Sequence, residues 1–274
     1  MGDARPGPPQ LRPGRALAHT TGASGSGSPH RSDSRPPQTP RGGRRPDLIG
    51  RPGTTPPVPG RPAFLLLLGI PALLFALITW QVVEDGPLLR ADARLSRALV
   101  HPDRLGGTLS DLGSVQVALP VLVAALAYVT WRHRRSGTDR WWLPATAGAL
   151  LMALVPVIVV PLKIWTDRPG TPVVPPASGY FPSGHTATAA IAYGTATLFL
   201  LPLLPTPRLR RALLLLCALL VLGTSYGLIR RGYHWPLDVA ASWCLSAVLL
   251  QLLALTVRRY GRKPAQDESS QPVA

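Results

Sequence analysis

Residues 181–185 read Phe-Pro-Ser-Gly-His, and residues 232–238 read Gly-Tyr-His-Trp-Pro-Leu-Asp. Each stretch places a histidine beside the start of a long apolar run, His185 in the first and His234 in the second. The start of a helix offers free backbone N–H groups and the positive end of the helix dipole, and both favour an anion. Asp238 follows four residues after the second histidine, where it can orient the imidazole ring. Two histidines and an aspartate so placed, with a lysine nearby, indicate phosphate-ester chemistry at the mouth of a membrane bundle.

The chain around these stretches is dominated by Leu, Ala and Val from residue 63 onward. Six apolar blocks are long enough to cross a hydrocarbon core of ~30 Å. They are Ala63–Val83, Val115–Trp131, Trp141–Leu162, Thr186–Leu204, Ala212–Ile229 and Pro236–Val257. The alternative is a set of buried helices in a large soluble protein, but soluble chains of this length rarely carry so many uncharged runs. The sequence therefore predicts an all-α fold, a six-transmembrane helical bundle over residues 63–257.

The segments on either side of the predicted bundle have a different composition. Residues 1–62 are rich in Pro, Gly, Ser and Arg and almost free of large apolar side chains, so they cannot bury a core. We expect a disordered basic arm there and a short tail over residues 258–274. No cleavable signal peptide is evident, and the first span is expected to act as an uncleaved anchor. Cys217 and Cys244 lie inside apolar blocks, where they are expected to be packing residues.

The net charge of +16 raises the possibility of a nucleic-acid partner, but its distribution favours a membrane protein. If six spans alternate, 21 of the 29 Lys and Arg residues fall on the side of the two termini and 8 on the other side. This asymmetry is the positive-inside pattern. It predicts a multi-pass protein of the plasma membrane with both termini cytoplasmic and both histidine stretches at the outer face. The bilayer is the expected partner, and the arm can also contact anionic headgroups.

Each candidate site residue also has a simpler interpretation. Lys163 is one of only two lysines beside 27 arginines, yet a lysine at a span end can be an interface anchor. Ser183 and Gly184 can form an ordinary capping turn before a helix. Asp238 can complement the dipole of the helix that Pro236 begins. These separate explanations do not account for the collection of both histidines, the aspartate and four cations on one face.

The chain resembles the type 2 phosphatidic acid phosphatase superfamily, which includes membrane lipid phosphatases. The signature of that family is K-x6-R-P, then P-S-G-H, then S-R-x5-H-x3-D. The second part matches in full at residues 182–185, the third matches at His234 and Asp238, and the first matches at Lys163. The order along the chain and the placement after the third and fifth spans also agree. The resemblance covers about residues 63–257.

Two positions depart from this signature. Arg168-Pro169 stands two residues early, because the family spacing from Lys163 leads to Gly170. The position six residues before His234 is Leu228, where the family expects arginine. Arg230 and Arg231 stand nearby. If the helix of the fifth span continues this far, its ~100° turn per residue places Arg231 close to the Leu228 direction and Arg230 on another side. We therefore expect Arg231 to supply the guanidinium.

The resemblance implies a mechanism and a set of roles. His234 would attack phosphorus to form a phosphohistidine, Asp238 would orient it, and His185 would protonate the leaving oxygen and later activate water. The phosphate oxygens would be held by the cations and backbone at Lys163, Arg168, Ser183, Gly184 and Arg231. No carboxylate cluster suggests a metal site, so we expect a metal-independent hydrolase without a cofactor.

The substrate expected from this resemblance is a lipid phosphate or an isoprenyl diphosphate, and no nucleic-acid partner is expected. A vanadium-dependent haloperoxidase shares the signature, but those relatives are soluble. A second alternative is a catalytically inactive scaffold or a transporter that kept the fold. Release of phosphate from a lipid phosphate without metal would separate the enzyme from that alternative.

Overall fold

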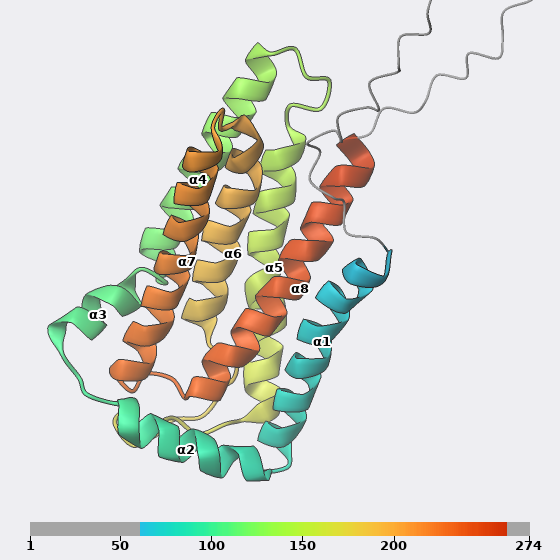
Figure 1. The fold of residues 1–274 in the computed structure, drawn as a ribbon. Coiled ribbons are helices and arrows are strands. Elements are labelled where there is room, and N and C mark those ends of the chain that lie inside the picture. The colour runs from blue at the N-terminus through green and yellow to red at the C-terminus, as the bar shows by residue number, and fades with distance from the viewer. Residues whose placement is uncertain (1–60, 262–274) are drawn as a thin grey trace, which may run out of the picture. The chain divides into compact units, whose positions relative to one another are not determined.

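A computed structural model describes residues 61–261 of the chain. The predicted arm, apart from its last two residues, and the tail beyond residue 261 lie outside the described residues. All regular elements within the described range are helices, as the sequence predicts (Figure 1).

Six of these helices are long and apolar enough to cross a membrane, and each overlaps one predicted span. The prediction of a six-span helical bundle is therefore confirmed. The helices are α1 (Arg61–Val83), α4 (Val115–Arg135), α5 (Leu143–Thr166), α6 (Gly184–Leu200), α7 (Pro207–Arg230) and α8 (Pro236–Gly261). A short 3-10 helix, η1 (Leu201–Leu203), extends α6.

The connection between the first two spans contains two helices that the sequence analysis treated only as an outer loop. These are α2 (Pro87–Leu99) and α3 (Arg104–Asp111). Helix α2 contacts α1, α7 and α8, whereas α3 packs along α7. Both lie where α7 ends and where α6 and α8 begin, and we call this the site end of the bundle (Figure 1).

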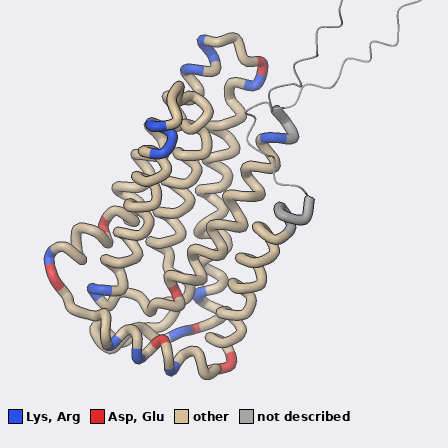
Figure 2. Tube along the Cα trace, in the orientation of Figure 1, with Lys and Arg blue, Asp and Glu red and all other residues tan. Residues whose placement is uncertain are grey.

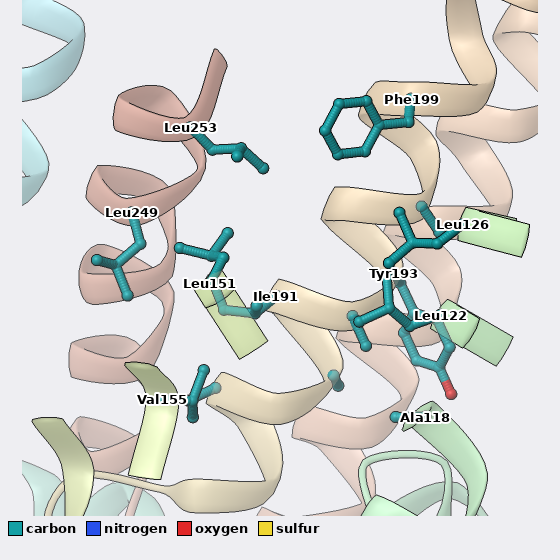
Figure 3. Packing of buried hydrophobic residues seen from close by; sticks show 14 of the residues in the cluster. Ala118, Leu122, Leu126, Leu151, Val155, Ile191, Tyr193, Phe199, Leu249 and Leu253 are labelled. Atoms are coloured by element: carbon teal, nitrogen blue, oxygen red, sulfur yellow. The ribbon is translucent and has the colours of Figure 1, made fainter. Parts of the chain in front are cut away.

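Helix α6 is the centre of the bundle. It contacts α4, α5, α7 and α8, and 67% of its span is buried against 22% to 39% for the other five. Small residues make this possible, because buried alanines such as Ala187, Ala189 and Ala192 let neighbouring backbones approach closely. Figure 3 shows the resulting core, where Ile191 of α6 faces Leu151 of α5 and Leu249 of α8 belongs to the same cluster.

The outer helices turn large apolar side chains away from the core. Leu73 of α1 is 70% exposed and Leu219 of α7 is 68% exposed. Many large apolar side chains facing outward are suited to a hydrocarbon surrounding. Hydrocarbon also requires the backbone to satisfy its own hydrogen bonds, as a helix does. Lys, Arg, Asp and Glu gather instead at the two ends of the bundle, and the middle is nearly free of them (Figure 2). The described helices thus match the thickness and polarity profile of a bilayer.

Candidate active site

His234 and Asp238 form a directly bonded pair at the start of α8. His234 Nδ1 lies 3.2 Å from Asp238 Oδ2, and the backbone N–H of Trp235 donates to the same oxygen over 3.1 Å. Pro236 begins the helix and Asp238 occupies its first turn, which explains the local geometry. Asp238 is fully buried and His234 is 7% exposed. Because Nδ1 is held by the carboxylate, Nε2 is the ring nitrogen left for chemistry.

The second histidine motif begins α6 and is bonded to the first. Ser183 caps the helix, where its Oγ accepts a hydrogen bond from the N–H of Thr186. The Ser183 N–H donates to the backbone carbonyl of Asp238 over 3.2 Å, and Ser242 Oγ donates to the carbonyl of Ser183 over 2.8 Å. The starts of α6 and α8 are therefore fixed against each other.

Gly184 and His185 are the open part of this motif. A Cβ added at Gly184 would meet no atom within 4 Å, so the backbone there borders free space rather than a packed neighbour. His185 is exposed, and it is close enough to His234 and Lys163 to interact electrostatically with both. The structure thus brings the two predicted histidines together.

Lys163 lies in the last turn of α5 and points to the loop before α6. Its Nζ donates to the carbonyls of Gly179 over 2.7 Å and of Tyr180 over 3.3 Å. The Tyr180 ring in turn packs edge-on against His234, with 5.8 Å between ring centres. An ammonium group has three donors, so one remains for a ligand.

A groove of about 630 Å³ runs from these residues between α4, α5 and α6. Its mouth is formed by Lys163, Gly184 and His185. Deeper in the groove the lining is apolar, with Leu122, Val155 and other aliphatic side chains. The arrangement offers a polar, cationic mouth and an apolar interior to one elongated ligand.

Arg168 is buried within a network of carboxylates. One terminal nitrogen lies 2.5 Å from Asp238 Oδ1 and the other lies 2.5 Å from Asp92 Oδ2. The guanidinium group also lies over the Trp235 ring, 5.4 Å from its centre. Its role as a phosphate ligand stays a prediction, and the described structure gives both terminal nitrogens carboxylate partners.

Arg230 and Arg231 both contact Asp103, the residue that caps the start of α3, but in different ways. Arg230 is the last residue of α7, and its Nε lies 2.7 Å from Asp103 Oδ2. Arg231 follows as the helix cap with helical dihedral angles, as the sequence extrapolation assumed. Its terminal nitrogens donate to Tyr233 Oη over 3.1 Å and to the carbonyl of Asp103 over 3.4 Å. The N–H of Gly106 and the Arg230 guanidinium hold the pKa of Asp103 below its usual range.

Asp92, Tyr180 and Asp103 were missed by the sequence analysis. Asp92 is the sole acidic residue of α2, and it shares a buried face with Ser96, four residues later. That i, i+4 spacing on an amphipathic helix was the available signal. Tyr180 and Asp103 lie in loops, where spacing alone does not predict contacts.

Comparisons with known proteins agree with these motifs. Residues 144–262 match the family model described as the PAP2 superfamily, and every predicted site residue lies in this range. A solved structure, the first transmembrane PAP2 type phosphatidylglycerolphosphate phosphatase from Bacillus subtilis, is 21% identical with a TM-score of 0.60. The match covers 72% of this chain and 98% of that one, and it shows a shared fold. None of the curated proteins searched matches the chain. The resemblance predicted from the histidine motifs is thereby confirmed, because residues 144–262 carry the pattern of the PAP2 superfamily within a helical membrane fold.

Proposed function

We propose that this protein is an integral membrane phosphatase that hydrolyses a lipid phosphate or an isoprenyl diphosphate at the outer membrane face. One observation carries the proposal. His234 is oriented by Asp238 with Nε2 left free, at a helix start that is hydrogen-bonded to the start of α6, where His185 stands. This is the arrangement that a nucleophile and a proton donor require.

An amphiphilic substrate suits the groove beside these residues. Its apolar walls, formed by α4 and α5, are suited to an acyl or isoprenyl tail. The mouth with Lys163 and Gly184 is suited to a phosphate at the headgroup level. The similar structure from Bacillus subtilis is that of a phosphatidylglycerolphosphate phosphatase, which supports a lipid phosphate as the substrate class.

The first chemical step forms a covalent intermediate. His234 Nε2 attacks phosphorus, the bond between phosphorus and the leaving oxygen breaks, and that oxygen takes a proton from His185. A lipid monophosphate releases the lipid alcohol, whereas a diphosphate releases the lipid monophosphate. Asp238 stabilises the positive charge that develops on the imidazole of His234. The positively charged side chains assigned to phosphate binding, together with backbone N–H groups, stabilise the phosphoryl oxygens.

The second step returns the enzyme to its starting state. Water attacks the phosphohistidine while His185, now neutral, accepts a proton from it. The bond between nitrogen and phosphorus breaks, inorganic phosphate leaves, and His234 is neutral again. The proposal needs no metal, and it assigns phosphate binding to Lys163, Ser183, Gly184 and Arg231, with Arg168 as a further candidate.

The test is turnover by the purified chain in detergent with a chelator, on phosphatidate, phosphatidylglycerol phosphate and isoprenyl diphosphates. We expect phosphate release by the wild type and none by His234→Ala. Labelled substrate quenched during turnover should leave acid-labile phosphate on the wild type only. His101→Ala is the matched control, because His101 is also a histidine near the site end but lies exposed in the connection between α2 and α3. Activity of His234→Ala within about tenfold of the wild type would exclude this nucleophile.

A catalytically inactive scaffold or a transporter is the second candidate function. It is favoured by the commitment of Arg168 to two carboxylates and by Leu228, buried where the family signature has arginine. An inactive wild type on all three lipid classes, together with saturable binding of one of them, would establish this alternative.

A further inference from the structure

Asp92 is a buried charge outside the family pattern. It lies on α2, before the matched residues 144–262, and only 3% of it is exposed. Buried carboxylates are rare unless they are paired, and they require compensating contacts. The contacts of this one lead to the candidate active site.

Both oxygens of Asp92 are used. Oδ2 lies 2.5 Å from a terminal nitrogen of Arg168, and Oδ1 accepts the N–H of Leu237 over 2.9 Å. Leu237 belongs to the first turn of α8, between His234 and Asp238. Asp92 therefore ties α2 to the loop after α5 and to the helix start that carries the proposed nucleophile.

The charges of this buried group do not cancel. Asp92 and Asp238 are two anions around one cation, Arg168, and His234 is neutral when it acts as a nucleophile. Within this bonded group one negative charge is in surplus, and Lys163, a further cation, is not bonded to it but is close enough to interact electrostatically with Asp238. Without Asp92, Arg168 would neutralise Asp238, and the pair would exert little attraction on a cation at His234. In a buried site this difference is large, because water does not screen it.

We infer that Asp92 is a positioning residue that holds Arg168 and offsets its charge, so that Asp238 keeps its full attraction for the positive imidazole formed during phosphoryl transfer. The inference rests on the proposed function, since it assigns a role within that reaction.

The pKa of the Asp92 carboxyl group is consistent with this role. Burial raises its pKa, and Asp238 adds to the rise, whereas Arg168 and the N–H of Leu237 oppose it. The folded state therefore takes up this proton before the unfolded chain does, so protonation of Asp92 favours the fold as the pH falls through its raised pKa. Activity, however, requires the charged form. Protonation of Asp92 in acid should therefore reduce activity without reducing stability.

The experiment compares the wild type with Asp92→Asn. Asparagine keeps the shape and can still accept from Leu237, but it removes the surplus charge. We expect kcat to fall about tenfold with little change in KM, because the affected charge develops only in the transition state. The acid limb of the kcat/KM profile should move to lower pH, and the melting temperature should not fall. Asp85→Asn is the matched control, an exposed carboxylate just before α2.

A second readout does not depend on turnover. The His234 imidazole, identified by its absence in His234→Gln, can be titrated by NMR in detergent. We expect its midpoint to be about one pH unit lower in Asp92→Asn, the equivalent of a tenfold effect. An unchanged midpoint, or a fall in kcat that Asp85→Asn reproduces, would overturn the role of Asp92. An inactive wild type would instead overturn the proposed function, while the NMR shift would still decide the electrostatic role.

Discussion

Asp238 is the side chain on which the site converges, since it accepts hydrogen bonds from Arg168, His234 and the backbone of Trp235. Such a carboxylate is fixed in position before any substrate arrives, and its orientation of the imidazole is therefore part of the folded state. The neighbouring arginines are less constrained. Arg230 and Arg231 are both only partly buried, and their partners are Asp103, just before α3, and Tyr233, in the loop after α7.

Arg231→Ala should reduce kcat/KM about a hundredfold, because it would remove a charge-assisted contact that strengthens in the transition state. Arg230→Ala is the matched control and should cost much less, since Arg230 is engaged with Asp103 at the surface. Steady-state kinetics on the same lipid phosphate measures both. If Arg230→Ala is the more damaging variant, Arg230 leaves Asp103 when substrate binds, and the helical extrapolation to Arg231 is wrong.

The residues of the site differ in how far the sequence predicts them. The spacing of four between His234 and Asp238 predicts a bonded pair, because the helix that begins between them places Asp238 in its first turn, within reach of the preceding His234 ring. The contact of Arg168 with Asp92 joins residues 76 positions apart, and no local pattern encodes it. Such partners depend on how α2 folds back over the bundle. The phosphate-binding assignments stay predictions.

Helices α3 and α7 pack closely against each other at Gly227. A Cβ at Gly227 would lie 2.5 Å from the backbone nitrogen of Ser110 and 2.7 Å from the carbonyl oxygen of Gly106. Backbone atoms cannot move aside as a flexible side chain can. Gly227 therefore fixes the distance between the two helices, and Arg230 and Arg231 follow within one turn.

Gly227→Ala should destabilise the protein by about 1–3 kcal/mol, as expected when a packed interface is forced apart. Gly107→Ala is the control, because a Cβ there would meet no atom within 4 Å and alanine favours a helix. Thermal unfolding in detergent should show a lower midpoint for the first variant and an equal or higher one for the second. Equal midpoints for wild type and Gly227→Ala would show that α3 is loosely held.

Helices α2 and α3 were not predicted, whereas all six long helices were. The long ones are recognised by uninterrupted apolar length, which the bilayer imposes. Helix α2 has 13 residues and α3 has 8, and both mix charges with leucines. Their formation depends on packing against α7 and α8 more than on composition, because short helices are only marginally stable alone.

The two ends of the bundle differ in the number of Lys and Arg residues that they carry. The basic clusters Arg132–Arg140 and Arg208–Arg211 lie at the end opposite the site end, where α4 finishes and α7 begins. The asymmetry of 21 against 8 Lys and Arg residues predicts that this end faces the cytoplasm. The proposed outer position of the active site depends on that orientation.

Cysteine labelling in intact cells tests the orientation. Ser178→Cys, at the site end, should react with a membrane-impermeant thiol reagent, and Ser136→Cys, at the far end, should not. Both serines are exposed, so accessibility alone does not distinguish them. The background carries Cys217→Ala and Cys244→Ala, which removes the free cysteines of the described helices. The reverse pattern would place the active site on the cytoplasmic side.

The central position of α6 has a consequence for the way the protein is made. Among the six candidate spans this helix has the lowest mean hydropathy, because alanine, threonine and glycine replace leucine where neighbours pack closely. Sorting of a segment into the bilayer during synthesis depends on its own apolar content. Helix α6 is therefore among the spans least able to insert alone, and we expect its retention to rely on α5 and α7, the more apolar helices on either side of it in the chain. Polar substitutions along α6 should consequently reduce the yield of assembled protein before they affect the chemistry at its first turn.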